Sequence, residues 1–328
     1  MNRLIQIKLW FCLIFLTLLT ACGGKPNTAS KYPLMVIAGR NQFIYFDYRV
    51  VYAVDESGTL LNVDLPKQED IGHEPAWSPD GRWIAHIYTN PHPFSTSDKD
   101  LYIMDASNYG KNMRVTHSIY PWFSAWSPDS RQIAISANDM KPPHDQTIYL
   151  LDVTCILRGE SCSPEPIFLT RGNFPDWSPD GKKIVYLDGD NDQIRVVDIH
   201  NPNEVVTVSQ GLTDCGFSKW SPDGKRIALI CSHTIYSVDP DGGNLTSLVK
   251  GAYHRLLWTP DGKKITFIGT ETLDPGLGRS MDAEGTNSST AVFMMDADGM
   301  NVTRITQGNE ESIGPMMWIP MDKIKKAP

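Results

Sequence analysis

The 328-residue sequence is poor in cysteine and in cations, and it has no second long apolar run. Six cysteines are present, and 30 Lys and Arg residues stand against 38 Asp and Glu residues, which gives a formal net charge of −8. An acidic chain repels the phosphates of nucleic acids, so we predict no nucleic-acid partner. After the first 22 residues no apolar run reaches the ~20 residues that a membrane-spanning helix needs. We therefore expect one water-soluble body.

Sequence strings typical of enzyme sites are also missing. The chain contains no H-E-x-x-H, P-loop, Rossmann glycine string or G-x-S-x-G. Its eight histidines are scattered, and only His73 and His254 share a position, four residues before a tryptophan. The string "DGDND" from Asp188 has the first carboxylates of a calcium loop but lacks the closing glutamate, so we interpret it as a solvated turn. We predict no catalytic residue, no metal and no cofactor.

The first 22 residues are typical of an export signal. The opening "MNRLIQIK" carries Arg3 and Lys8 and no acid, and Leu9–Leu19 is uncharged. The string "LTAC" follows and ends at Cys22, which resembles the lipobox of bacterial lipoproteins, whose cysteine is acylated. We predict a lipoprotein signal peptide over 1–22 and a lipid anchor at Cys22, on the periplasmic side of the envelope or on the outer cell surface. An ordinary secretory signal with a chance cysteine is the alternative.

The remainder divides into a short tether and one folded region. Residues 23–31, "GGKPNTASK", are polar and contain Gly and Pro, as flexible linkers do. Residues 32–328 are then the folded region, which we expect to be monomeric. Export favours disulfides over free thiols among the cysteines that remain. These are Cys155, Cys162, Cys215 and Cys231.

A five-letter string recurs through the folded region. It reads "WSPDG" from Trp77, Trp177 and Trp220, "WSPDS" from Trp126, "WTPDG" from Trp258 and "WIPMD" from Trp318. Pro presets φ at the second turn position, Gly relieves a positive φ at the fourth, and Ser can bond back to the turn amides. The string therefore predicts a tight hairpin turn.

Strands surround every copy of this turn. An Ile-rich run follows each turn, and a further run ends at an Asp that can form an Asx-turn, as in "DLYIMD" at Asp105 and "TIYLLD" at Asp152. Each unit is thus a four-stranded meander, and the tryptophans recur about every 48 residues, the spacing of propeller blades. We predict an all-β, six-bladed β-propeller of four-stranded antiparallel blades in which each tryptophan fills the gap between blades.

The two ends of the chain complement one another. The copy at Trp318 lacks outer strands, whereas the N-terminal region has the strands "QFIYFD", "VVYAVD" and "TLLNVD" without a tryptophan copy. We predict that these N-terminal strands close the ring on the C-terminal blade. The string "YPLMVIAG" from Tyr32 stays unplaced: it either extends that blade or lies over one face.

The repeat has a family resemblance. W-S-P-D-G-K/R-x-I-A followed by I-Y-x-x-D resembles the WD-like repeat of TolB-type β-propellers, over roughly Phe43 to Trp318. The resemblance implies a propeller, here as a bacterial lipoprotein without the N-terminal domain of TolB. Related repeats occur in prolyl-oligopeptidase-like enzymes, whose hydrolase string is missing here.

The four cysteines of the folded region form two local pairs. In a regular hairpin that turns on Pro222-Asp223-Gly224, Cys215 and Cys231 face each other on adjacent strands. Cys155 and Cys162 bracket the loop "ILRGES". We predict the disulfides Cys155–Cys162 and Cys215–Cys231.

The longest and most varied loops are expected opposite the repeated turns, over 89–100, 137–146 and 269–290. Binding sites concentrate on such loops of a rigid scaffold; the alternative is that these loops are merely tolerated insertions. The position four before each tryptophan opens on the same rim, which is expected to be acidic. The candidate binding rim comprises His73, Trp122, Asn173, His254, Asp139, Asp188, Asp190 and Asp214. We predict a non-enzymatic binding scaffold of the cell envelope whose partner is an envelope protein or a small polar ligand; the alternative is a lyase or hydrolase that uses the central channel mouth.

Overall fold

A computed structural model describes residues 34–42, 45–55, 59–61, 72–89, 99–110, 112–117, 119–138, 146–269, 291–306 and 312–318. The chain separates into a unit Met1–Lys31 and a unit Tyr32–Pro328. All described residues belong to the second unit. The predicted signal peptide, the lipidated Cys22 and the tether 23–31 therefore lie outside the described residues.

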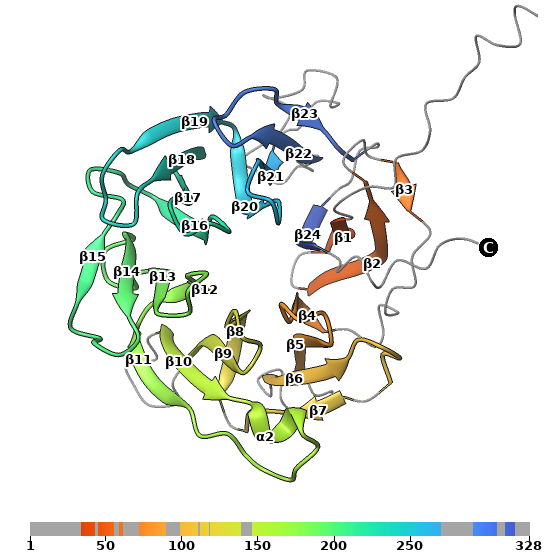
Figure 1. Ribbon diagram of the computed structural model, residues 1–328. Helices are drawn as coiled ribbons and strands as arrows, with labels where there is room; N and C mark the ends of the chain where they lie inside the picture. The colour runs from red at the N-terminus through yellow and green to blue at the C-terminus, as the bar shows by residue number, and fades with distance from the viewer. Residues whose placement is uncertain are drawn as a thin grey trace, which may run out of the picture. The chain divides into compact units, whose positions relative to one another are not determined.

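The second unit is all-β apart from one short helix in its described part. Five sheets are each built from four consecutive antiparallel strands (Figure 1). Blade 1 contains β4 (His73–Trp77), β5 (Trp83–Thr89), β6 (Lys99–Asp105) and β7 (Asn112–Arg114). Blade 2 contains β8 (Tyr120–Trp126), β9 (Gln132–Asn138), β10 (Gln146–Asp152) and β11 (Ile167–Arg171), with α2 (Thr154–Leu157) before β11.

The next three blades repeat this order. Blade 3 contains β12 (Asn173–Trp177), β13 (Lys183–Leu187), β14 (Ile194–Asp198) and β15 (Val205–Thr207). Blade 4 contains β16 (Cys215–Trp220), β17 (Ile227–Cys231), β18 (Thr234–Val238) and β19 (Thr246–Lys250). Blade 5 contains β20 (Ala252–Trp258), β21 (Lys264–Gly269), β22 (Ala291–Asp296) and β23 (Thr303–Arg304). The predicted propeller of four-stranded antiparallel blades is confirmed.

The remaining sheet joins the two ends of the chain. Its order is β24-β1-β2-β3, with β24 (Ser312–Trp318) innermost, then β1 (Leu34–Gln42), β2 (Tyr45–Val54) and β3 (Leu60–Leu61). Leu34 pairs with Trp318 on one side and with Val54 on the other. The unplaced string "YPLMVIAG" thus supplies the second strand of this composite sheet. "QFIYFD" is not a separate strand, because Tyr45 already begins β2, which runs on through "VVYAV".

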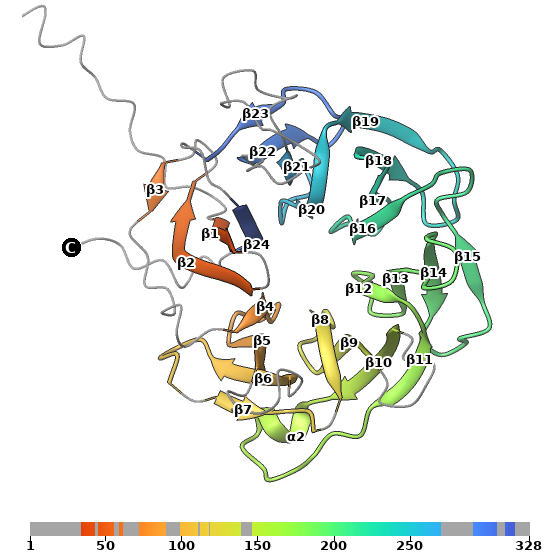
Figure 2. The same ribbon diagram turned by 180° about the vertical axis from the view of Figure 1, so that it is seen from behind.

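The inner strands contact one another in a closed circuit. β4 contacts β8, and β8, β12, β16, β20 and β24 follow in turn until β24 contacts β4 (Figures 1 and 2). Each hydrophobic cluster of the described residues lies between two neighbouring sheets, as with Ile87 of blade 1 and Ile133 of blade 2. The composite sheet shares one cluster with blade 5 and another with blade 1. No blade has a core of its own, so stability comes from stacking.

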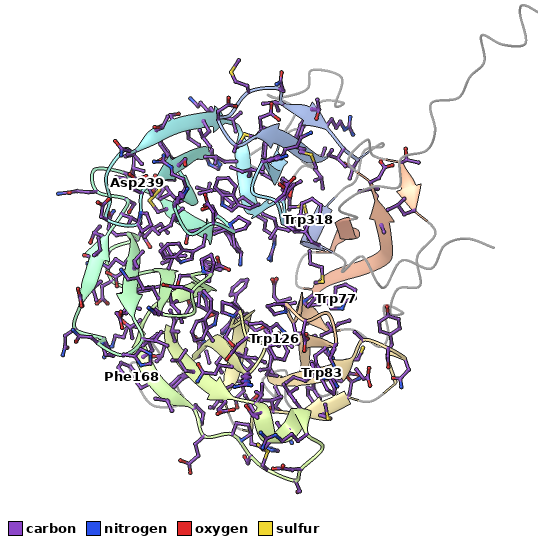
Figure 3. All side chains as sticks on the ribbon, in the orientation of Figure 1. Trp77, Trp83, Trp126, Phe168, Asp239 and Trp318 are labelled. Atoms are coloured by element: carbon purple, nitrogen blue, oxygen red, sulfur yellow. A yellow bond between two sulfur atoms is a disulfide. The ribbon has the colours of Figure 1, made fainter. Side chains whose placement is uncertain are left out.

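The repeated tryptophans join adjacent blades, as the sequence predicts. Trp77, Trp126 and Trp318 lie towards the centre of the unit, whereas Phe168 lies at its outer edge (Figure 3). The Trp126 Nε1 donates to the carbonyl oxygen of Ala76 in the preceding blade at 3.0 Å. Trp177 makes the same bond to Ala125, at 3.1 Å, and Trp258 to Lys219, at 3.1 Å. Burying one indole contributes at most about 4–6 kcal/mol.

The repeated turns are closed by their own side chains. The Ser78 hydroxyl donates to Asp80 Oδ1 at 2.6 Å and accepts from the Trp83 amide at 3.0 Å. The same two bonds recur in the turns of blades 2 to 5. Where Gly81 has a φ of 70°, the second turn has Ser130 at 59°, and the Ser130 hydroxyl accepts from the Asp80 amide of blade 1 at 3.1 Å. This bond between blades compensates part of the strain that Ser carries there.

Candidate functional site

Each inner strand of blades 1 to 5 carries a β-bulge shortly before its tryptophan. In β4, His73 pairs with Ile87 and Ala76 pairs with Ala85, so two residues of β4 face one of β5. The register shifts at the corresponding place in β8, β12, β16 and β20. Within the bulge Glu74 has a φ of 50°, in the left-handed region. Bulges re-aim side chains, and here they present the residue three before each tryptophan to the central cavity.

These residues form what we call the mouth ring. Its members are Glu74, Phe123, Phe174, Phe217 and Arg255. They line one cavity of about 290 Å³ that extends along the inner strands to Trp77 and Trp318. Each inner strand runs towards its repeated turn, so the ring lies nearer the opposite side, which we call the mouth face. The side with the repeated turns is called the turn face.

Three phenyl rings from three consecutive blades make up one side of the mouth ring. The centroid of Phe174 lies 4.3 Å from that of Phe123 and 4.2 Å from that of Phe217. Phe123 and Phe217 are 5.9 Å apart, edge to face. Phe174 has a φ of 53°, so a second bulge residue is held in the left-handed region. This left-handed conformation carries backbone strain, and it goes together with the gathering of the three phenyl rings at the axis.

A bidentate ion pair makes up the other side. Arg255 from β20 donates through both Nη atoms to the Glu74 carboxylate from β4, with Nη1 to Oε2 at 2.7 Å. The Arg255 and Glu74 side chains are only 20% and 17% exposed, so both charged groups are largely removed from water. The guanidinium also lies 5.0 Å from the Phe217 centroid and 5.8 Å from that of Phe123, within the range of cation–π attraction.

A second ion pair stands beside the ring. Lys219 Nζ lies 2.7 Å from Asp176 Oδ1, and Asp176 Oδ2 accepts from the Trp220 amide at 2.9 Å. Asp176 thereby bonds the inner strands of blades 3 and 4. Lys219 lines the cavity, and its charge is neutralised by this pair.

Trp122 and His73 of the predicted rim lie beside a lysine. Trp122 is 39% exposed, and Lys99 Nζ stands 3.6 Å from the centre of its ring. Desolvation lowers the pKa of Lys99. Desolvation, with a smaller effect from the charge of Lys99, also lowers the pKa of the exposed His73. This side of the mouth face thus joins a cation to an exposed indole.

The structure does not place Asn173 and Asp188 on an open rim. Both are buried, at 6% and 4% exposure. Asn173 Oδ1 accepts from the Ser136 hydroxyl at 2.6 Å, and Asp188 Oδ2 lies 2.8 Å from Arg195 Nη1. The two side chains bind within the fold, and the residue that reaches the cavity in blade 3 is Phe174.

The other predicted rim residues are partly outside the described region. Asp190 is exposed in the loop between β13 and β14, and Asp214 is exposed directly before β16. His254 lies in β20, but its side chain is not among those described, and Asp139 lies outside the described residues, as does most of each long loop. The sequence reasoning missed the mouth ring. The position three residues before each of the first five repeated tryptophans holds Glu, Phe, Phe, Phe and Arg. This run of aromatic and charged residues at one repeat position is the sequence signal that could have identified the mouth ring.

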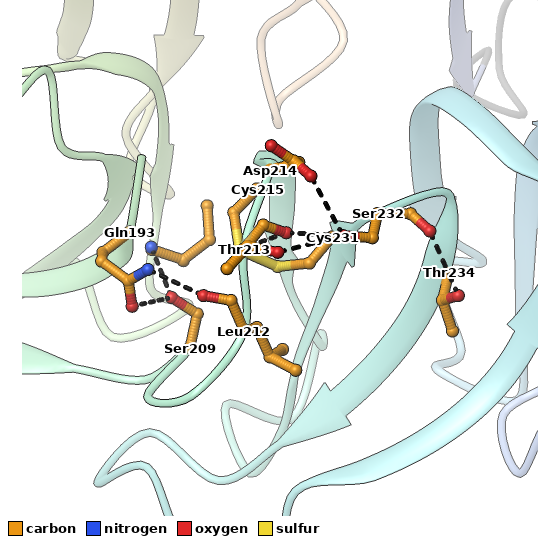
Figure 4. Close-up of a disulfide and its surroundings, with 10 residues drawn as sticks. Gln193, Ser209, Leu212, Thr213, Asp214, Cys215, Cys231, Ser232 and Thr234 are labelled. Atoms are coloured by element: carbon orange, nitrogen blue, oxygen red, sulfur yellow. Dashed lines mark hydrogen bonds between the residues drawn. A yellow bond between two sulfur atoms is a disulfide. The ribbon is translucent and has the colours of Figure 1, made fainter. Parts of the chain in front are cut away.

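Both predicted disulfides are present, Cys155–Cys162 and Cys215–Cys231. Figure 4 shows Cys215 and Cys231 beneath Asp214 and Ser232 at the mouth-face end of β16 and β17. Ser232 Oγ donates to the Thr213 carbonyl oxygen at 3.0 Å. The Cys155–Cys162 disulfide links α2 to the loop before β11.

Among the residues that the structure describes, no helix is long and apolar enough to cross a membrane. The same residues contain no group of three His, Cys, Asp or Glu side chains placed to hold a metal ion.

The closed circuit of four-stranded sheets defines a β-propeller, and solved structures share the fold. TolB from Acinetobacter baumannii is 17% identical with a TM-score of 0.61, over 88% of this chain and 67% of that one. A TolB candidate from Agrobacterium tumefaciens is 19% identical with a TM-score of 0.57, over 88% and 99%. A chain of the nidogen–laminin complex is 9% identical with a TM-score of 0.58, over 88% and 98%.

The likeness to these proteins is one of structure. No protein-family model matches the sequence, and no curated protein matches it significantly. The chain therefore has the fold of TolB-like β-propellers, and its identities to them are low enough that the fold alone carries over.

Proposed function

We propose that this chain is a non-enzymatic binding scaffold of the cell envelope that meets its partner with the mouth face. The observation that carries the proposal is the mouth ring, in which a bidentate ion pair and three phenyl rings converge on one cavity. Mixed apolar and charged groups in a concave site on a rigid scaffold are typical of a recognition site. Both charged members of the ring are paired, which favours binding over acid–base chemistry.

The turn face supports the assignment by contrast. Its Ser and Asp side chains bond within their own turns, which contain no aromatic residue, and the exposed charges beside them are basic residues after each turn, such as Arg82 and Lys182. The mouth face instead presents Trp122 with Lys99, and exposed aromatic anchors next to charges are characteristic of interfaces. We infer an envelope protein or a small polar ligand as partner.

The finer architecture belongs to the same proposal. Counting the composite sheet as a blade gives six blades, closed where β1 pairs with β24. Closure protects the inner strands from edge-to-edge pairing and keeps the mouth ring rigid. Rigidity favours binding, because little conformational freedom is lost on association.

Export and lipidation complete the proposal. We infer from the charged start, the apolar run and "LTAC" that Cys22 carries lipid and anchors the chain in an envelope membrane, with the propeller on the periplasmic side or the outer surface. Stable anchoring by lipid requires more than one acyl chain, because a single chain binds marginally.

The test separates the anchor from the face. Metabolic labelling with palmitate is expected to mark the wild type and not Cys22→Ala. Capture from envelope extracts is compared among the wild type, Trp122→Ala on the mouth face and Lys182→Glu on the turn face. We expect loss of the captured partner only with Trp122→Ala. Loss with Lys182→Glu alone, while both variants remain folded, assigns binding to the turn face and refutes the proposal.

A further inference from the structure

The geometry points to a cation-binding cage in the mouth ring, made of Glu74 and the three phenyl rings, which Arg255 occupies from within the chain. Its external ligand is a guanidinium or ammonium group, such as an Arg or Lys side chain of a partner. This inference rests on the proposed binding role of the mouth face, because it names the chemistry of what that face receives.

The cage components come from blades other than that of the cation. Glu74 is on β4, and the phenyl rings are on β8, β12 and β16, whereas Arg255 enters from β20. A carboxylate opposite aromatic faces is the arrangement that stabilises a partly desolvated cation, because both present negative potential to it. Without Arg255 the Glu74 carboxylate, which is 17% exposed, would be left without its counter-charge.

The guanidinium of Arg255 shows where a ligand's charged group fits. It lies 5.0 Å from the Phe217 centroid, 5.8 Å from that of Phe123, and 2.7 Å from a Glu74 oxygen. The Arg255 side chain is 20% exposed, so the site it occupies is not sealed from solvent. A partner cation that replaced it would reproduce the same contacts.

The cavity beneath the ring has room for the apolar part of such a ligand. It measures about 290 Å³ and is lined by Leu256, Met316 and Met317 in addition to the ring. A central channel is a regular feature of β-propellers, and here its wall next to the ion pair is apolar. The aliphatic stem of Lys or Arg packs well against such walls.

An anionic ligand is the competing possibility, in which a partner carboxylate replaces Glu74 on Arg255. The Glu74 side chain is shorter than that of Arg255, so its carboxylate has less reach for a second position. Displaced from Arg255, it would lack the counter-charge that it has now. The longer Arg255 side chain is the member that can move away.

The test removes the internal cation and supplies an external one. Arg255→Ala is titrated with millimolar methylguanidinium chloride, against sodium chloride at equal ionic strength, by calorimetry and thermal unfolding. The matched control is Arg226→Ala, which removes an Arg that pairs with Asp239 and lies over no aromatic ring of the described residues. We expect methylguanidinium to bind Arg255→Ala saturably and to raise its melting temperature, and to do neither with Arg226→Ala. The wild type is expected to bind methylguanidinium at least about tenfold more weakly than Arg255→Ala.

Further variants keep the test decisive. Arg255→Met retains the stem and replaces Arg255→Ala if the latter does not fold. In either background Glu74→Gln is expected to weaken methylguanidinium binding by about tenfold, and Phe217→Leu is expected to weaken it as well. Equal responses of the Arg255 and Arg226 variants, or tighter binding of acetate than of methylguanidinium by the wild type, overturn the inference. None of these outcomes depends on finding the partner, so the cage can fail while the mouth-face scaffold stands, and the reverse.

Discussion

Glu74 and Arg255 are 181 residues apart in the sequence and form a bidentate ion pair that connects blade 1 to blade 5 past the composite sheet. Glu74→Gln leaves a partly buried guanidinium without its counter-charge. We expect a loss of about 1–3 kcal/mol in the free energy of unfolding, measured by urea denaturation. Asp239→Asn, in the more exposed pair with Arg226, whose two side chains are each 28% exposed, is the control and should cost less. Equal losses would show that Glu74 contributes no more than this more exposed pair.

The hydrogen bonds from the repeated indole N–H groups to the preceding blade predict a difference in stability between two otherwise similar substitutions. Trp126→Phe removes a donor to the Ala76 carbonyl oxygen, whereas the Trp220 Nε1 is buried with no partner in the described structure. Both variants lose the same ring atoms, so their difference reports the hydrogen bond. We expect Trp126→Phe to be less stable than Trp220→Phe by about 0.5–1.5 kcal/mol in chemical denaturation. If the denaturation curves of the two variants coincide, the indole hydrogen bond contributes nothing measurable to stability.

The buried His86 makes stability depend on pH. Its Nδ1 accepts from the Gly72 amide at 2.9 Å, and its Nε2 donates to Asn112 Oδ1 at 2.8 Å, which fixes the neutral form. Desolvation lowers its pKa below the model-peptide value of 6.5, against a smaller opposite effect of Asn112. The unfolded chain therefore takes up the proton first, and stability present above about pH 6.5 is lost as the pH falls below it.

Thermal unfolding at pH 8 and pH 5 measures this dependence. His86→Gln is expected to show a smaller drop in melting temperature between the two pH values than the wild type. The exposed His73, whose pKa is lowered in the same direction, contributes a second part, so His73→Gln is measured in parallel. An unchanged pH dependence in both variants would mean that other groups cause it.

The two disulfides are expected to differ in reactivity and in contribution to stability. Cys215 and Cys231 are 7% and 1% exposed, whereas Cys162 is exposed, so dithiothreitol should reduce Cys155–Cys162 first, as followed by alkylation and mass spectrometry. The separations of 16 and 7 residues predict losses of about 3 and about 2 kcal/mol on replacing each pair by serines. Earlier reduction of the buried pair would reveal local opening at the mouth face.

The blade architecture was readable from the sequence because turn chemistry and strand patterns repeat at a fixed interval. Pro, Asp and Gly act locally, so the turn at Ser78 could be derived without knowledge of the rest of the chain. The composite sheet could be inferred only in outline, since nothing local states that Leu34 pairs with Trp318.

The bulges explain most of what the sequence reasoning missed. A regular hairpin pairs Cys215 with Cys231, yet Trp220 pairs with Ile227, one residue off that register, and the bulge between Cys215 and Ser218 restores the pairing. The disulfide was thus predicted by a register that holds only beyond the bulge. The same irregularity moved the channel-lining position from Asn173 to Phe174, because an extra residue reverses which side chain faces inward.

The pairing of Leu34 with Trp318 also decides how the molecule responds to a pull on its N-terminal side. Tension that arrives along the chain enters β1 at Leu34, the first residue of a strand hydrogen-bonded to β24 on one side and β2 on the other. Leu34 is paired with Trp318, the last residue of β24, so a load between the N-terminal and C-terminal sides acts on one end of the β1–β24 pairing and opens its hydrogen bonds one after another. Single-molecule stretching between these two sides should therefore break the seam of the ring before it disturbs any blade built from consecutive strands.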